Sequence, residues 1–463
     1  MGASYLDRDR LHRSIAAIAT APGTGAISIV RISGGDAIDI GAAIFSRPAL
    51  LLDAPSHTLH HGKVTSVDGS TIDDVLMAVM RAPRSYTAEN VVEIQSHGGT
   101  VQASAVLRAA VQAGALAALP GEFTFRAFYN GRIDLTQAES VADIIGAGTD
   151  LAARVALRQS DGVLRTELDG LRDRLVGLRA RLEAAIDFVD DDIPALEMPI
   201  VLRDIESVHS RVTRLLSSYD VGRIIRSGAE VVLSGPPNVG KSSLFNALLR
   251  FDRAIVTEIP GTTRDALTEG IDVCGLPVVL ADTAGMRESV DIVELEGVKR
   301  SHQYRERADL ILEVREATAK SQSVEPDYPR ERGLRPTLHI LNKTDLLSAA
   351  HSAHMAGRYP EAVQVSAITG LGIDRLRQRI YDLLVLQRWS EGDLTITRQR
   401  HFEDLGRCQS ALERTRQFIQ DNAPLEVAAI ELRSACDALE VLTGKVYDEE
   451  ILNRIFGEFC VGK

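Results

Sequence analysis

The chain has 463 residues, of which 45% are hydrophobic, and a formal net charge of −12 at pH 7. This length predicts two or three domains with cores of their own. The acidic balance argues against a broad nonspecific grip on nucleic acid, and no apolar run approaches the ~20 residues of a membrane span. No signal peptide is apparent, and the four cysteines are spaced too widely for a zinc pattern, so we expect a cytoplasmic protein with reduced thiols.

Strand-like and helical runs alternate in the first part of the chain, from about Ser14 to Ala118. Apolar runs with polar turns between them predict strands, and apolar residues at helical spacing predict helices. We therefore expect a compact α+β head domain. The predicted strands are 26–32, 74–81 and 91–95, and the predicted helices are 37–45 and 100–113.

Two charged residues, Arg31 and Glu93, interrupt apolar strands of this head. Buried charges are rare unless they are paired or bound to a ligand. Strand alternation by itself favours the simpler interpretation, in which both side chains lie on the solvent face.

Helical periodicity takes over after Gly131. Leucines recur at alternating spacings of four and three, which predicts one long amphipathic helix with a heptad seam. Arginines recur beside the seam, but carboxylates are interspersed among them, so a salt-bridged solvent face is favoured over a contact with RNA. The seam consists of Leu164, Leu168, Leu171, Leu175, Leu178 and Leu182.

A glycine-rich loop separates the apolar run 231–233 from the helical pattern LFNALL. Its pattern is Gly235-x-x-x-x-Gly240-Lys241-Ser242, which is typical of a P-loop. Glycines let backbone N–H groups close around phosphates, Lys241 supplies a point charge, and the Ser242 hydroxyl can hold Mg²⁺. The loop therefore predicts binding of a nucleoside triphosphate.

Four later segments fit the same ligand in the required order: TEIPGTTRD (257–265), DTAG (282–285), NKTD (342–345) and the Ser366-Ala367 pair. The Asp345 carboxylate can accept from the two N–H groups of guanine, which adenine does not offer. The ligand is thus expected to be GTP, and this region resembles the Ras-like (translation-factor-related) GTPases with a mostly parallel sheet.

The expected GTP-binding residues share a place on these five segments. They are Asn238, Val239, Gly240, Lys241, Ser242, Ser243, Thr257, Glu258, Ile259, Pro260, Gly261, Thr262, Thr263, Asp282, Thr283, Ala284, Gly285, Asn342, Lys343, Thr344, Asp345, Ser366, Ala367 and Ile368.

Met286 follows the DTAG segment, where Ras-type enzymes keep a water-orienting glutamine. A thioether cannot orient water, so hydrolysis needs other help. Glu288 could align the water, or it is a solvated surface carboxylate, and Arg264 and Arg287 are rival donors of positive charge. A monovalent cation could also stabilise the phosphates. The oxygens available to coordinate it belong to Asn238, Thr257, Ile259 and Thr262.

The GTPase region should close near 384–388, after which helical periodicity resumes in 402–412 and 430–442 and ends at Gly444. Helical segments on both sides of the GTPase have apolar faces, and the simplest way to bury them is against each other. We therefore expect a multidomain α/β protein in which the GTPase is inserted into a discontinuous helical domain. The final FCVGK by composition alone is typical of a frayed tail. The expected domains are a head at 1–130, a helical domain in two parts at 131–227 and 388–463, and a GTPase domain at 228–387.

The whole chain resembles the MnmE (TrmE) family of tRNA-modification GTPases. The most specific segments are 83–99, 120–139, the GTTRD loop and the Cys460–Lys463 terminus. The resemblance implies a tetrahydrofolate derivative, in its 5-formyl or methylene form, held by Arg31, Glu93, Arg132 and Lys463. Relatives often have lysine at position 132. It also implies K⁺ ligands at Asn238, Thr257, Ile259 and Thr262, Mg²⁺ ligands at Ser242 and Thr263, a water-aligning Glu288, and a part in the modification chemistry for Cys460.

The resemblance further implies a homodimer that forms a heterotetramer with the flavoprotein MnmG (GidA). Together they would add an aminomethyl or carboxymethylaminomethyl group at the 5-position of the wobble uridine of certain tRNAs. Two alternatives stay open at this point. One is a regulatory or ribosome-assembly GTPase, which would not need a folate pocket, and the other is a stand-alone one-carbon transferase regulated by GTP.

Overall fold

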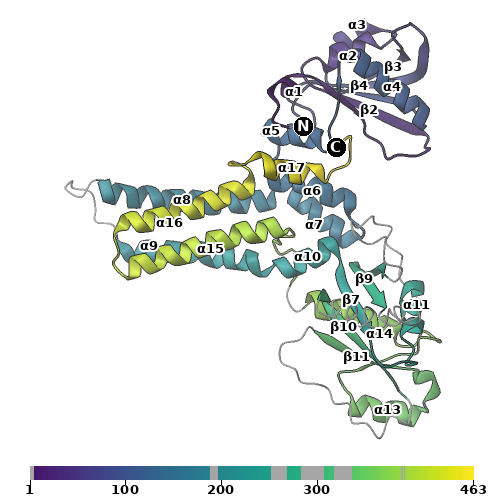
Figure 1. The fold of residues 1–463 in the computed structure, drawn as a ribbon, viewed down its shortest axis with the longest axis vertical. Helices are drawn as coiled ribbons and strands as arrows, with labels where there is room; N and C mark the ends of the chain where they lie inside the picture. Colours follow the sequence, from purple (N-terminus) through teal and green to yellow (C-terminus); the bar gives the residue numbers. More distant parts are fainter. Residues whose placement is uncertain are drawn as a thin grey trace, which may run out of the picture. The chain divides into compact units, whose positions relative to one another are not determined.

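The computed structural model of the chain describes residues 5–187, 197–251, 268–282, 307–317, 336–386, 389–390 and 392–463 (Figure 1). The chain divides into two compact units. The first unit joins Met1–Ala142 and Ser160–Leu168 to Leu439–Lys463, and the second joins Asp143–Gln159 to Asp169–Ala438. These limits differ from those of the three expected domains, whose boundaries stay a prediction.

The first unit is built on a six-stranded sheet in the order β3-β4-β5-β2-β1-β6. Neighbouring strands are antiparallel, except that β1 and β6 are parallel. The three strands expected from apolar runs are confirmed as β2, β4 and β5. The strands are β1 (Ile15–Ile18), β2 (Ile27–Ser33), β3 (Thr58–Thr65), β4 (Thr71–Met80), β5 (Val91–His97) and β6 (Leu116–Ala117).

Helices of the first unit pack into two separate apolar cores. One core holds Ile38 of α2, Val106 of α4 and Val92 of the sheet, so these helices cover one sheet face. In the other core Phe125 of α5 contacts Phe456 of α17, which joins the start of the chain to its last helix. The helices are α1 (Arg8–His12), α2 (Ala37–Ala43), α3 (Pro48–Leu52), α4 (Thr100–Gln112), α5 (Glu122–Tyr129), α6 (Leu135–Gly146) and α17 (Glu449–Gly457).

Long helices from both sides of the GTPase region lie side by side, as expected for an inserted domain. In Figure 1, α9 and α15 are neighbours, and Thr213 of α9 accepts a 2.8 Å hydrogen bond from Gln409 of α15. The six leucines of the predicted seam are all buried in α8. Ile430, expected on the apolar face of α16, is instead 64% exposed. The helices are α7 (Asp150–Ser160), α8 (Val163–Asp187), α9 (Met198–Ser217), α10 (Tyr219–Ser227), α15 (Gln399–Gln420) and α16 (Leu425–Thr443).

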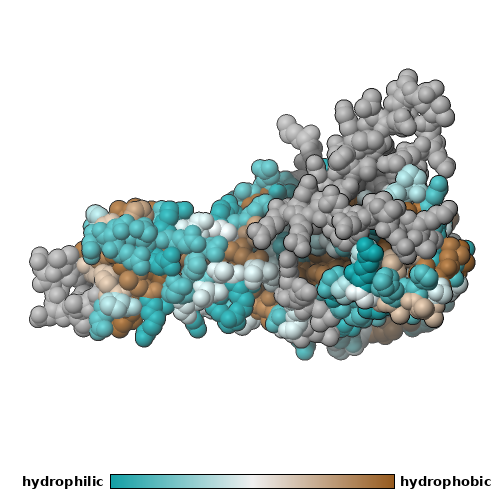
Figure 2. Space-filling view, turned by 90° about the horizontal axis from the view of Figure 1, so that it is seen from below, coloured by the Kyte–Doolittle hydropathy of each residue, from teal (hydrophilic) through white to brown (hydrophobic). Residues whose placement is uncertain are grey.

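The outer faces of these helices are mainly polar. Figure 2 shows hydrophilic side chains over most of the visible surface of the long helices, with hydrophobic ones between them. Arg181 of α8 and Asp204 of α9 form one of the surface ion pairs, at 2.8 Å. Among the residues that the structure describes, no helix combines the length and the apolar character needed to cross a bilayer.

The sheet of the second unit has the order β12-β11-β10-β7-β9-β8 and is parallel except between β8 and β9. The buried positions of its strands are mainly apolar and pack against helices that include α10, α11 and α14. This is the expected α/β GTPase fold. The elements are β7 (Ala229–Ser234), α11 (Lys241–Phe251), β8 (Thr268–Val273), β9 (Leu276–Asp282), β10 (Leu310–Glu316), β11 (Thr337–Asn342), η3 (Thr344–Leu346), α13 (Ala349–Arg358), β12 (Val363–Gln364), α14 (Ile373–Tyr381) and η4 (Asp382–Leu386).

Candidate nucleotide and ligand sites

The P-loop connects the central strand β7 to α11, and two of its glycines have neighbours too close for a side chain. Gly235 has a φ of 142°, and a Cβ there would lie 2.2 Å from the carbonyl oxygen of Val314. Gly240 has a φ of 92°, and its Cβ would lie 2.4 Å from the Asn342 amide nitrogen. Larger residues are excluded at both positions, so the backbone can form the cradle that phosphates need.

Lys241 is held inside this loop. Its side-chain nitrogen donates to the carbonyls of Gly235, at 3.1 Å, and Pro236, at 2.8 Å. The residue is only 7% exposed. A shielded ammonium group at a helix N-terminus provides positive charge where a triphosphate would bind. The residues present therefore fit the predicted ligand.

The NKTD segment fastens the P-loop to the loop after β12. The Asn342 side-chain nitrogen donates to the Val239 carbonyl at 3.0 Å, and its oxygen accepts from the Ala367 backbone N–H at 3.1 Å. Lys343 donates to the Asn238 carbonyl at 2.8 Å and to Glu316 at 2.9 Å. Three segments expected to bind GTP therefore meet in space.

Asp345 carries the carboxylate expected to read guanine. One of its oxygens accepts a 2.6 Å hydrogen bond from the Ser366 hydroxyl, and Ser366 is fully buried. The Ser366 oxygen in turn accepts from the Thr369 backbone N–H at 3.2 Å. Asp345 itself is exposed. The buried Ser366 hydroxyl therefore orients its carboxylate, which stays accessible to a base.

The metal-binding predictions can be placed only in part. Ser242 is in the first turn of α11, and Asp282 ends β9 in register with Leu233 of β7, beside the P-loop. Asn238 has a φ of 64°, and its backbone carbonyl accepts a hydrogen bond from the Lys343 side chain. The following predicted residues lie outside the described ones: Thr257, Glu258, Ile259, Pro260, Gly261, Thr262, Thr263, Thr283, Ala284, Gly285 and Glu288, with Arg264, Met286 and Arg287.

A second group of predicted residues meets on the first sheet. Arg31 and Glu93 are paired in register between β2 and β5, and their side chains form a 2.8 Å ion pair. Their side chains are 17% and 20% exposed. They are therefore more shielded from solvent than the solvent-facing position that strand alternation predicts. The shielding comes from neighbouring aromatic residues, including Phe123, whose ring centroid lies 5.6 Å from the Arg31 guanidinium carbon.

The Cys460–Lys463 tail packs against the same face, so the frayed tail favoured by composition is wrong. Gly462 is buried with a φ of 99°, and a Cβ there would lie 2.2 Å from the Ile18 carbonyl oxygen. The tail is hydrogen-bonded: Phe123 N–H donates to the Lys463 carbonyl at 3.1 Å, and Gly121 N–H donates to the Cys460 carbonyl at 3.3 Å. Its position depends on contacts that composition does not reveal.

Arg132 completes what we term the charged cluster, formed by Arg31, Glu93, Arg132 and the Cys460–Lys463 tail. The Arg132 guanidinium donates to the Ser85 carbonyl, and Arg31 donates to the Gly462 carbonyl at 3.5 Å. Both arginines lie over the Tyr86 ring. Sequence reasoning missed Tyr86 and Phe123, although both belong to the segments, 83–99 and 120–139, that carry the family resemblance.

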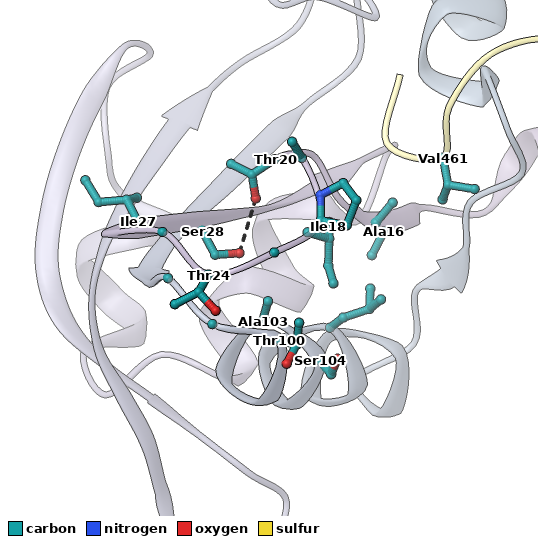
Figure 3. A pocket seen from close by; sticks show the side chains of 18 of the residues that line it. Ala16, Ile18, Thr20, Thr24, Ile27, Ser28, Thr100, Ala103, Ser104 and Val461 are labelled. Atoms are coloured by element: carbon teal, nitrogen blue, oxygen red, sulfur yellow. Dashed lines mark hydrogen bonds between the residues drawn. The ribbon is translucent and has the colours of Figure 1, made fainter. Parts of the chain in front are cut away.

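The charged cluster lies beside a cavity of about 640 Å³ at the edge of the sheet. Figure 3 shows Ile18 of β1, Thr100 and Ser104 of α4, and Val461 of the tail around it. The lining is mainly apolar and includes no charged side chain. The dashed line in Figure 3 marks the hydrogen bond between the Thr20 and Ser28 hydroxyl groups, which are 3.3 Å apart. Because the charged residues do not line the cavity, the tail is what links the two features.

Cys460 differs from the cysteines of the long helices in being exposed. Cys408 of α15 and Cys436 of α16 are buried free thiols. Burial raises the pKa of Cys408 to about 12, which keeps it protonated and unreactive. Cys460, in the tail that belongs to the charged cluster, is therefore better placed for chemistry.

Family descriptions and curated relatives match nearly the whole chain. The family description "GTP-binding protein TrmE N-terminus" matches residues 14–132, and "MnmE helical domain" matches 135–460. A protein of Desulforamulus reducens is 38% identical, covering 98% of this chain and 100% of its own length, and one of Carboxydothermus hydrogenoformans is 40% identical, covering 97% and 99%. Both are called tRNA modification GTPase MnmE. The chain belongs to the MnmE family.

Two solved structures that resemble this MnmE family member match only part of the chain. An Era variant of Aquifex aeolicus bound to GDP and AlF4⁻ is 24% identical, covers 41% of this chain and 66% of its own, and has a TM-score of 0.26. The FeoB G-domain of Methanococcus jannaschii is 25% identical, covers 34% and 97%, and has a TM-score of 0.24. The MnmE assignment depends on the full-length relatives and not on these structures.

Proposed function

We propose that this chain is a potassium-dependent GTPase that acts with MnmG in tRNA modification. The product would be an aminomethyl or carboxymethylaminomethyl group at the 5-position of the wobble uridine, with the one-carbon unit taken from a tetrahydrofolate derivative. The observation that supports this most is the presence, in one MnmE-family chain, of a P-loop joined to a guanine-type loop and of a separate charged cluster closed by the tail.

In the GTP site, the P-loop N–H groups and Lys241 bind the phosphates, and Asp345 accepts from guanine. Bound Mg²⁺ and K⁺ would supply positive charge against the phosphates. Ser242 and Thr263 would hold Mg²⁺. Glu288 aligns the attacking water, in place of the glutamine that Met286 replaces. The proposed K⁺ ligands are Asn238, Thr257, Ile259 and Thr262.

In the first unit, Arg31, Glu93, Arg132 and Lys463 would bind the folate. The paired and partly shielded Glu93 carboxylate and Arg31 guanidinium offer hydrogen-bond acceptors and donors to the polar edge of the pterin ring of a folate. These residues therefore fit the predicted ligand. Cys460 acts in the modification chemistry. The chain works in the cytoplasm as a homodimer that assembles with MnmG.

The proposed reaction is tested by mass spectrometry of the wobble uridine in cells lacking this protein. The expected result is loss of the 5-substituent, restored by the wild-type chain but not by Lys241→Ala. A matched control is Lys445→Ala, which changes a lysine outside the P-loop. An unchanged wobble uridine in the deletion strain would contradict the proposal.

The potassium requirement has its own prediction. Replacing K⁺ by Na⁺ should collapse GTP turnover in the wild-type protein, because the smaller ion does not match the proposed oxygen ligands. Asn238→Ala should turn over GTP slowly in both salts while still binding a fluorescent GTP analogue. Equal wild-type rates in KCl and NaCl would rule out the cation role.

A further inference from the structure

Tyr86 lies within reach of two cations of the charged cluster. The guanidinium carbon of Arg31 is 5.8 Å from the centroid of its ring, and that of Arg132 is 5.4 Å away. Both distances are within the ~6 Å over which a cation is attracted by an aromatic face. Arg31 comes from β2, Tyr86 from the segment between β4 and β5, and Arg132 from the segment between α5 and α6, so one ring joins three distant parts of the sequence.

The ring itself is fixed by its surroundings. The Tyr86 hydroxyl is 2.9 Å from the Thr124 hydroxyl of α5, and Thr124 is fully buried. Burial raises the pKa of the Tyr86 phenol, so the side chain stays neutral in the physiological range. A neutral, anchored ring can act through its face but not as a proton carrier.

The two arginines have different partners. Arg31 is neutralised by Glu93 at 2.8 Å, with a further contact to the Gly462 carbonyl. Among the described residues, no carboxylate forms an ion pair with Arg132. The Arg132 guanidinium donates to the Ser85 carbonyl and lies over the Tyr86 ring. Arg132 therefore keeps its positive charge available, and Tyr86 is what holds that charge near Arg31.

We propose that Tyr86 is a positioning residue of the folate site, whose ring holds Arg31 and Arg132 so that both guanidinium groups face one ligand. This inference rests on the folate function proposed above. A side chain that only filled space could be replaced by an aliphatic one of similar size. A ring that orients two cations could be replaced only by another ring.

The test uses the full chain with Tyr86→Phe and Tyr86→Leu, and with Tyr129→Leu as a control because Tyr129 is an exposed tyrosine of the same unit. Calorimetry measures binding of 5-formyltetrahydrofolate. NMR of selectively labelled arginine Nε–H groups, assigned with Arg31→Lys and Arg132→Lys, reports the position of both cations without any ligand. Thermal unfolding and GTP affinity show that each variant is folded.

Tyr86→Leu should shift both arginine signals and weaken folate binding at least ~10-fold, equivalent to about 1.4 kcal/mol. Tyr86→Phe should retain the affinity within about twofold, because the ring and its cation contacts remain. Tyr129→Leu should leave both readouts unchanged. If Tyr86→Leu unfolds early, Tyr86→Met takes its place with the same expectations.

The outcomes separate the inference from the function on which it rests. Unchanged arginine signals in the folded aliphatic variant would overturn the positioning role. Shifted arginine signals with unchanged folate affinity would show that the positioning of the arginines by Tyr86 does not matter for folate binding. Shifted signals in a protein whose wild type binds no folate would support the positioning role and overturn the folate proposal.

Discussion

Asp345 is oriented by one hydrogen bond from a buried neighbour, and this arrangement has a measurable consequence. Asp345→Asn should reduce the preference for GTP over xanthosine triphosphate roughly 10–100-fold, because a hydrogen bond to a charged group contributes about 1.5–3 kcal/mol. Ser366→Ala should weaken GTP binding less, because the carboxylate remains but loses its 2.6 Å support. Competition binding with the two nucleotides measures both effects.

Asp374→Asn provides the control, because Asp374 is a highly exposed carboxylate of α14 with a partner, Arg377, only 3.4 Å away. It should leave base preference unchanged. A full preference for GTP in Asp345→Asn would show that the base is read elsewhere.

Gly462 supports the tail through a conformation that other residues cannot adopt easily. Gly462→Ala should displace the tail and weaken folate binding at least ~10-fold, because its Cβ would lie 2.2 Å from a backbone oxygen and φ is 99°. Gly457→Ala is the matched control, since no atom lies within 4 Å of the Cβ it would introduce. Equal calorimetric affinities for the two variants would show that the tail is not needed.

At the scale of elements, β10 and β11 share a charged network beside the GTP site. Hydrogen bonds from His339 of β11 and from Arg315 lower the pKa of Glu313 from its ordinary 4.5 to about 2. A carboxylate with a lowered folded-state pKa stabilises the protein above its unfolded pKa, and this stabilisation is lost as pH falls through the folded value.

Glu313→Gln should therefore lower the melting temperature at neutral pH, and its difference from wild type should shrink between about pH 4.5 and pH 2. Glu361→Gln is the control, because Glu361 is highly exposed and 3.4 Å from Arg379. Calorimetric melting over this range measures the difference. A difference that stays constant with pH would assign the effect to packing.

Sequence patterns predicted the elements around the GTP site well, for a physical reason. The strand before the P-loop, its glycines and the helix after it are neighbours in the chain, so local spacing determines them. The leucine seam of α8 was equally readable. The exposure of Ile430 was not, because it depends on which helix packs alongside α16.

At the scale of the whole molecule, the charged cluster was the harder part to predict. Arg31 and Glu93 stand out in the sequence as charges in apolar strands, and the family resemblance groups them with Arg132 and Lys463. Their contacts with Tyr86 and with the backbone of the tail appear only in the fold. Pairing across distant segments leaves no periodic signal. Residues 257–263 and Glu288 lie outside the described structure, so their roles stay predictions.

The net charge of −12 supports a prediction about tRNA. The isolated protein should bind tRNA weakly and with a shallow dependence on salt, because few phosphates would be neutralised by its cations. Adding MnmG should raise the affinity and steepen the salt dependence. Filter binding across a salt series measures both slopes. Tight tRNA binding by this chain in the absence of MnmG would contradict the prediction.

The first unit draws its last helix and tail from the far end of the chain, with roughly 300 residues between Ala142 and Leu439. At a synthesis rate of about 5–20 residues per second, the ribosome needs on the order of half a minute to make that stretch. During this time the nascent head lacks the helix that contacts Phe125 and the tail whose Gly462 carbonyl accepts a hydrogen bond from Arg31. The folate binding that we propose would therefore be acquired only late in translation, after the GTPase has emerged.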